Sequence, residues 1–105
     1  MNFKKLTKES REISQQFSKK FQWGKKERFI DLVEEVGELA NAILVEEKNK
    51  PKRVLHKGNS IADALCDILF DLLLLADYYR IDLGKEYVEM LKRLKRRIKK
   101  GEFEE

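Results

Sequence analysis

Residue types that brace or interrupt particular folds are scarce in this sequence. Among 105 residues there are one cysteine, Cys66, one proline and five glycines. A single cysteine cannot close a disulfide within the chain, and it has no neighbours at zinc-ligand spacing, so a disulfide framework and a structural zinc site are excluded. The low glycine and proline content argues against a turn-rich all-β fold and excludes a collagen-like one. The composition indicates a helical protein from a reducing compartment.

Long apolar runs are also absent. The longest uninterrupted one is Leu72–Ala76, far short of the roughly 20 residues that a membrane-spanning helix requires. The first five residues lack the apolar core of a signal peptide. We therefore expect a soluble, cytoplasmic protein without a membrane partner, folded as one domain over residues 1–105.

Charge is plentiful and is arranged in blocks of one sign. Charged residues make up 40% of the chain. Residues 31–47 hold six acidic side chains and no lysine or arginine, and residues 58–79 hold four aspartates without a basic residue. The loop at 48–59 and the segment at 92–100 are basic. The two acidic blocks need a cation from elsewhere, either a metal ion or the basic segments.

The spacing of apolar residues predicts an all-α bundle of four helices. The third helix is apolar nearly all round, so it should lie at the centre, whereas the fourth is expected to extend past the body. For the second helix we expect a buried stripe made of Phe29, Leu32, Val36, Leu39, Ala40 and Ile43. The first helix is expected at about 8–22, after the N-cap Thr7, and the second at about 26–47. The third is expected from the N-cap Ser60 to about Arg80, and the fourth at about 83–100, between the N-cap Asp82 and Gly101.

Carboxylates lie beside the apolar stripes of the second and third helices. At 100° per residue, Glu35 and Glu38 are about 60° apart on the second helix. On the third helix, Asp63, Asp67 and Asp71 follow one another at four-residue intervals. An ionised carboxylate in an apolar interior needs a partner. With no basic residue seen near them on either segment, we expect that partner to be the fourth helix or a divalent ion, for which oxygen ligands favour Mg²⁺ and allow Mn²⁺.

Each pattern also has a purely structural interpretation. Asp63 can belong to the N-terminal cap of the third helix. Glu35 and Glu38 can form a solvated helix face, and Asp67 and Asp71 can pair with basic residues of the fourth helix. The basic run of that helix is either a solvated face or a surface for phosphate or nucleic acid.

Two acidic motifs resemble the signature of the MazG-like nucleotide pyrophosphohydrolase family. They are Glu34–Ala40 and Asp63–Asp71, followed by Ile81–Leu83, in the order and spacing of the family. The resemblance covers roughly residues 15–90. It implies an all-α, dimeric or tetrameric enzyme that binds Mg²⁺ and hydrolyses a nucleoside triphosphate to the monophosphate and pyrophosphate.

The second motif departs from the family pattern at one position. When Asp67 is aligned with the family's aspartate, Ala64 stands where the family has a glutamate. The resemblance implies Glu35 and Glu38 as catalytic residues, with Asp67 as a further metal ligand and Asp63 as the stand-in for the missing glutamate. The hypothesis for substrate binding places Arg93 and Arg97 on the polyphosphate, Trp23 or Phe21 on the base, and Asp71 in the same site.

Three other functions remain open. A catalytically lapsed family member would bind nucleotide and Mg²⁺ without turnover, which Ala64 and Leu94 suggest, since Leu94 stands near the place of a family asparagine. A small nucleic-acid-binding protein would use the basic segment at 92–100, and its binding would weaken with salt. A structural interaction protein would show neither metal dependence nor nucleotide affinity.

Overall fold

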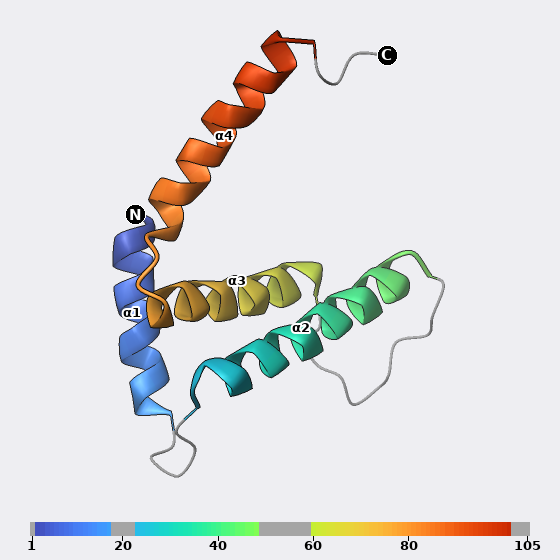
Figure 1. Cartoon of the computed structure of the whole chain (residues 1–105). Coiled ribbons are helices and arrows are strands. Elements are labelled where there is room, and N and C mark those ends of the chain that lie inside the picture. Colours follow the sequence, from blue (N-terminus) through green and yellow to red (C-terminus); the bar gives the residue numbers. More distant parts are fainter. Residues whose placement is uncertain (1, 18–22, 49–59, 102–105) are drawn as a thin grey trace.

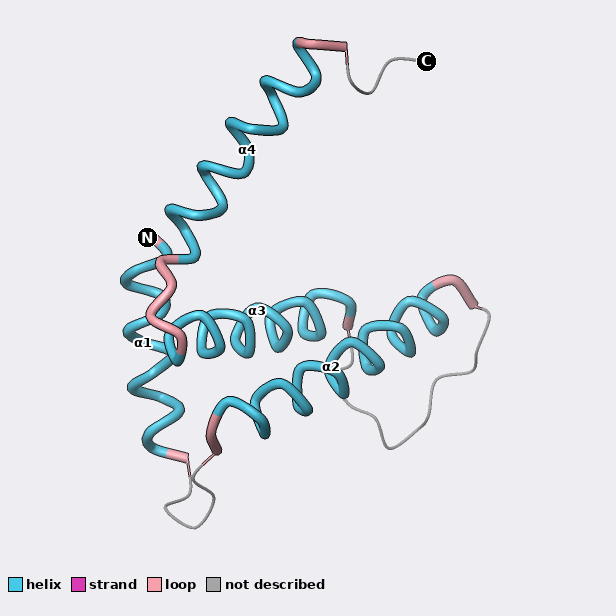
Figure 2. The backbone as a smooth tube through the Cα atoms, viewed as in Figure 1, coloured by secondary structure: helices cyan, strands magenta, loops and turns pink. Residues whose placement is uncertain are grey.

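The computed structural model describes residues 2–17, 23–48 and 60–101. They form α1 (Phe3–Gln16), α2 (Lys25–Glu46), α3 (Ile61–Tyr78) and α4 (Leu83–Lys99). No strand occurs within these ranges, so the predicted all-α class is confirmed. Figures 1 and 2 show α2 and α3 side by side, α1 across one end of them, and α4 extending away.

The N-caps of α3 and α4 are the predicted ones. The hydroxyl oxygen of Ser60 accepts from the backbone N–H of Asp63 at 3.0 Å, and Oδ1 of Asp82 accepts from the N–H of Lys85 at 3.1 Å. Past the end of α4, Gly101 has φ 74°, the left-handed conformation that glycine adopts without a Cβ penalty. Local side-chain chemistry therefore sets these helix ends.

The first helix is present, but its predicted bounds and N-cap were wrong. It begins at Phe3 because Oδ1 of Asn2 accepts from the N–H of Lys5 at 2.9 Å and caps it. The expected cap, Thr7, lies inside the helix, where its hydroxyl donates to the carbonyl of Phe3 at 2.7 Å. The helix ends at Gln16. The expected continuation at 18–22 lies outside the described residues, as do residues 49–59 of the expected loop.

The central helix is α3, as predicted. It packs along α2 and also against α1, and it buries Leu73, Leu74 and Ala76. By contrast, α4 touches the body near its own start, where Gly84 lies against Phe3: a Cβ at position 84 would come within 3.0 Å of the Cβ of Phe3. The radius of gyration is 17.3 Å, against about 13 Å for a compact chain of about 100 residues.

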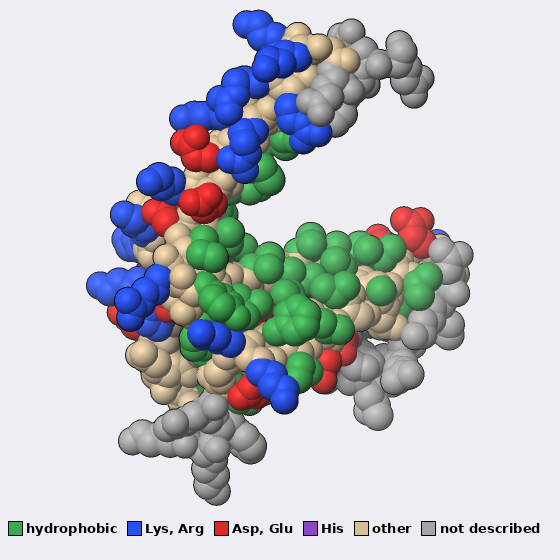
Figure 3. Space-filling model, viewed as in Figure 1, with side chains coloured by type: hydrophobic (Ala, Val, Ile, Leu, Met, Phe, Trp, Pro, Cys, Tyr) green, Lys and Arg blue, Asp and Glu red, His purple; other side chains and the backbone are tan. Residues whose placement is uncertain are grey.

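The buried side of α2 differs from the predicted stripe. Ala42 is buried and Leu32 and Leu39 are half-buried, but Phe29, Val36 and Ile43 are 57%, 51% and 42% exposed. The latter three belong to a second stripe, which lies exposed beside the interface with α3. With matching residues of α3 it forms an apolar face, which Figure 3 shows in green. We define the apolar face as Phe29, Val33, Val36 and Ile43 of α2 with Leu65, Leu69, Leu72 and Tyr79 of α3.

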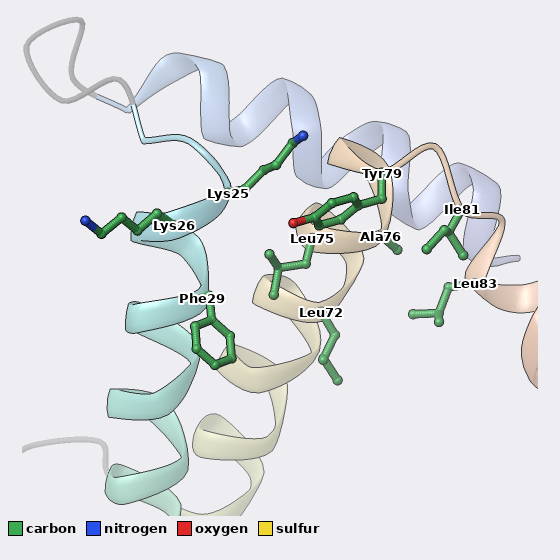
Figure 4. A pocket seen from close by; sticks show the side chains of 9 residues that line it. All are labelled: Lys25, Lys26, Phe29, Leu72, Leu75, Ala76, Tyr79, Ile81 and Leu83. Atoms are coloured by element: carbon green, nitrogen blue, oxygen red, sulfur yellow. The ribbon is translucent and has the colours of Figure 1, made fainter.

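A pocket of about 590 Å³ lies at one end of the apolar face, between the start of α2 and the end of α3 (Figure 4). Phe29, Leu72 and Leu75 line it, and Lys25 and Lys26 stand at its edge. The ammonium group of Lys25 lies 4.7 Å from the centre of the Tyr79 ring. None of the described helices is both long and apolar enough to span a membrane.

Candidate active site

The carboxylates of α2 and α3 lie away from the apolar face, either on the opposite side or toward the interface between the two helices. At 100° per residue, Glu38 is about 180° around α2 from Phe29, and Asp67 is about 160° around α3 from Leu65. Glu38 and Asp67 therefore lie opposite the apolar face, whereas Glu35 and Asp71 lie toward the interface between α2 and α3. We define the acidic face as Asp31, Glu35, Glu38, Asp67 and Asp71.

Glu35 is at the centre of the acidic face. Its pKa is raised from 4.5 to about 7, first by burial and then by the charge of Asp67 across the helix interface, with smaller contributions from Asp31, Asp71 and Glu38. Like charges raise a carboxyl pKa in this way only when they are close and lack a cation between them. The carboxyls of Asp67 and Glu38 are therefore among the charges near Glu35.

Asp71 forms a buried ion pair with Arg28. Its side chain is 1% exposed, and Oδ1 accepts from Nη1 of Arg28 at 2.9 Å. Burial, followed by the neighbouring Asp31, raises the pKa of Asp71 to about 6, and Arg28 opposes this shift. The expectation that the fourth helix would supply the cation was wrong, because it comes from the first turns of α2.

Arg28 gathers groups from all three packed helices. Its Nη2 lies 3.4 Å from the hydroxyl oxygen of Ser14 in α1. The guanidinium carbon lies 4.9 Å from the centre of the Trp23 ring and 5.6 Å from that of Phe70, distances at which cation–π attraction acts. Trp23 is fixed further by Tyr78, whose hydroxyl donates to the Trp23 carbonyl at 2.7 Å.

The other predicted site residues differ in their relation to the acidic face. Trp23 is 40% exposed and lies next to it through Arg28. Asp63 is exposed in the first turn of α3 and is not among the charges that act on Glu35. Arg93 and Arg97 lie on the half of α4 that extends away from α2 and α3 (Figure 1), so one chain does not bring them to the acidic face. Phe21 lies outside the described residues.

The donors of the acidic face suit a hard divalent cation in kind and in charge. Within the described part of the chain, no three Asp, Glu, His or Cys residues are already gathered as a metal-binding group. However, burial and then the neighbouring carboxylates raise the pKa of Glu35, and carboxylate oxygens are the ligands that Mg²⁺ takes. A divalent ion among Glu35, Glu38 and Asp67 would relieve this repulsion.

Sequence reasoning missed Arg28. The signal was present, because Arg28 stands in register with Leu32, Glu35, Leu39 and Ala42 at spacings of four, three, four and three residues. That register is the side of α2 that faces α3. A basic residue in the core-facing register of a helix indicates a buried ion pair. Here the partner of Arg28 is Asp71, which is likewise a charged residue on the core-facing side of its helix, α3.

Comparison with known proteins places the chain in a family. The model of the MazG nucleotide pyrophosphohydrolase domain matches residues 24–101. A similar solved structure is iMazG from Vibrio DAT 722, at a TM-score of 0.57 and 24% identity, with 94% of this chain and 97% of that chain covered. No curated protein sequence matches. The family match spans α2, α3 and α4 with the whole acidic face, and the chain therefore belongs to the MazG nucleotide pyrophosphohydrolase domain family.

Proposed function

We propose that this protein is a Mg²⁺-dependent nucleoside triphosphate pyrophosphohydrolase. The observation that supports this most strongly is the position of Glu35, whose pKa is raised by burial and by the carboxylates of both family motifs. Such a group of acids is costly without a cation and suits a site that binds a divalent ion together with phosphates. Glu35, Glu38 and Asp67 would hold the ion, with Asp63 at the edge of the site.

The reaction is the attack of water on the α-phosphorus. The water oxygen forms a bond to phosphorus, the bond from phosphorus to the α,β-bridging oxygen breaks, and the nucleoside monophosphate and pyrophosphate separate. When bound, Mg²⁺ would neutralise the charge of the phosphates. Glu35 or Glu38 accepts the proton of the water.

The nucleotide base would lie near Trp23. The indole is partly exposed, and the Tyr78 hydroxyl and the Arg28 guanidinium hold the residue beside the acidic face. An aromatic ring that is held in place stacks on a base at little entropic cost. Asp71 forms a buried ion pair with Arg28, so we propose that it supports the substrate site from within the helix interface.

We further propose that the working form is a homodimer or homotetramer. The apolar face is exposed along both α2 and α3, and an apolar surface of this extent on a small protein marks an interface. Because Glu38 and Asp67 lie opposite the apolar face, a symmetric contact through the apolar face leaves them accessible. Arg93 and Arg97 would then reach a polyphosphate only from a second copy.

The test is the release of pyrophosphate from the common ribo- and deoxyribonucleoside triphosphates, with and without Mg²⁺. We expect metal-dependent release that falls at least about 100-fold in Glu38→Gln, the size of a lost general base or ligand. Glu46→Gln is the matched control, since Glu46 is an exposed acid of α2 outside the acidic face. Equal loss in both variants, or release without metal, would contradict the proposal.

A lapsed, nucleotide-binding member of the family is the alternative, and one observation favours it. Ala64 occupies the place of a family glutamate and is buried against α2 at 5% exposure. The site therefore has one carboxylate fewer than the family motif. Tight binding of nucleotide and Mg²⁺ without pyrophosphate release, measured by calorimetry, would support this alternative.

A further inference from the structure

The ion pair between Arg28 and Asp71 is the most buried polar contact among the described residues. The two side chains are 7% and 1% exposed, and Nη1 and Oδ1 are 2.9 Å apart. Neither partner is fully satisfied: Nε of Arg28 and Oδ2 of Asp71 are buried and have no hydrogen-bond partner in the described part of the structure. Asp31 also neighbours Asp71, and it can donate a hydrogen bond only when it is protonated.

Such a pair adds little to stability. Taking both charges out of water costs about as much as their attraction returns, and apolar residues of similar volume often do as well. The two buried atoms without hydrogen-bond partners lower the net contribution of the pair to stability further. In some proteins a buried pair in a helix interface instead gives specificity, because it favours one alignment of the helices over other alignments that bury similar apolar area.

The position of the pair fits that role. The start of α2 lies beside the end of α3, with the Tyr78 hydroxyl on the Trp23 carbonyl at 2.7 Å. Arg28 and Asp71 meet further along the same interface, and Glu35 and Asp67 interact beyond them. The two helices are therefore antiparallel, and the ion pair lies between the Trp23 contact and the centre of the acidic face.

The alignment matters for the acidic face in particular. Glu35 follows Arg28 by seven residues and Asp67 precedes Asp71 by four, so each acid is one or two turns from the ion pair on its own helix. Sliding α2 by one turn moves its side chains by about 5.4 Å. That shift would break the ion pair and would separate Glu35 from Asp67 at the same time.

We propose that Arg28 and Asp71 are positioning residues that lock the register of α2 against α3, so that the carboxylates of the two acidic motifs face one another. This inference rests on the proposed function, in which those carboxylates hold a divalent ion. The lock acts through the helices and touches neither metal nor substrate. The nearby Ser14 hydroxyl and the rings of Trp23 and Phe70 hold the guanidinium in place.

The main test replaces both partners by apolar residues, Arg28→Met with Asp71→Leu. We expect a folded protein whose melting temperature stays near the native value. Its affinity for Mn²⁺, read from the EPR signal of the free ion, is expected to fall at least about tenfold, as for other losses of support behind metal ligands. The control is Arg11→Gln with Asp77→Asn, which removes the exposed ion pair between α1 and α3 and should leave Mn²⁺ affinity unchanged.

A second measurement reads the register without any metal. Nitroxide labels on Cys66, which is exposed on α3, and on Ala40→Cys of α2 give a distance by pulsed EPR. We expect one narrow distance in the native background and a broadened one, or one displaced by about 5 Å, in the apolar double variant. If that variant does not fold, Arg28→Gln with Asp71→Asn, which keeps a hydrogen bond between neutral groups, takes its place.

The outcomes separate the two proposals. A changed distance together with weaker Mn²⁺ binding supports the lock. An unchanged distance and unchanged Mn²⁺ affinity in a folded double variant would overturn it. If the native chain binds no Mn²⁺ while the distance still changes in the variant, the proposed function is overturned and the lock between α2 and α3 stands.

Discussion

Asp67 on α3 is the charge that most raises the pKa of Glu35 on α2, after the effect of burial itself. The two residues come from different motifs and are 32 positions apart in the sequence. Their interaction joins these motifs into one site.

The first prediction follows from this pKa. A carboxyl whose pKa is raised on folding, from 4.5 to about 7 for Glu35, stabilises the fold below its ordinary pKa, and this stability is lost as the pH rises through 7. Without metal, we expect the melting temperature to be higher at about pH 5.5 than at about pH 8. Glu35→Gln should flatten this difference. A melting temperature that rises with pH over the same interval in the native chain would contradict the expectation.

The second prediction concerns divalent metal at high pH. A bound cation stabilises the ionised form of Glu35 and so competes with its proton. We therefore expect Mg²⁺ to raise the melting temperature more at about pH 8 than at about pH 5.5. Ca²⁺-free buffers and a chelator supply the baseline. The same added stability at both pH values would show that Glu35 takes no part in binding.

The third prediction restores the missing family carboxylate. In Ala64→Glu the new side chain enters the side of α3 that faces α2, so we expect a cost of about 1–3 kcal/mol without metal because the site is already packed. With Mg²⁺, its carboxylate adds to the acidic face, and pyrophosphate release should rise. Ala62→Glu, at an exposed position of α3, is the control. Equal behaviour of the two variants would remove Ala64 as the cause of any low activity.

The fourth prediction tests the apolar face. We expect Val36→Glu and Leu69→Glu to convert the oligomer to a monomer in light scattering, because a charge buried in a symmetric contact meets its own copy. Both residues are exposed in the single chain, at 51% and 36%, so each variant should still fold. Gln15→Glu on α1 is the control. A native chain that is monomeric at high concentration would refute the homo-oligomer.

The fifth prediction concerns the turn after α3. Arg80 has φ 57°, and the N–H of Ile81 bonds back to the carbonyl of Ala76 at 2.8 Å, the arrangement in which glycine is preferred. We expect Arg80→Gly to stabilise the fold by about 1 kcal/mol in chemical denaturation. The same change at Arg93, inside α4, should destabilise it by about 1 kcal/mol. A loss of stability at both positions would contradict the role given to the left-handed turn.

The parts of the fold that local chemistry determines were predictable. Ser60, Asp82 and Gly101 set helix ends through bonds within one turn, and each was identified from residue type and spacing. The start of α1 was missed because Asn2 competes with Thr7 as a cap, and residue type alone does not rank two suitable caps five positions apart.

Tertiary choices were less predictable. Helix α2 has apolar residues on two sides, so its period does not reveal which side meets α3. The widest apolar stripe, with Phe29 and Val36, is exposed in the single chain, while the side with Arg28 and Glu35 is buried or half-buried. The pairing of Arg28 with Asp71 depends on which side of α2 packs against α3. For this reason the sequence predicted that Asp71 needs a cation but did not identify Arg28 as that cation.

The attachment of α4 has a mechanical consequence. This helix is about 26 Å long at 1.5 Å per residue, and it is held near one end by the contact of Gly84 with Phe3 and by the turn at Arg80. A rotation of about 10° at the turn would therefore move the far end of α4 by between about 4 and 5 Å. The conformation of residues 80–84 therefore determines where the basic residues at the far end of α4 lie.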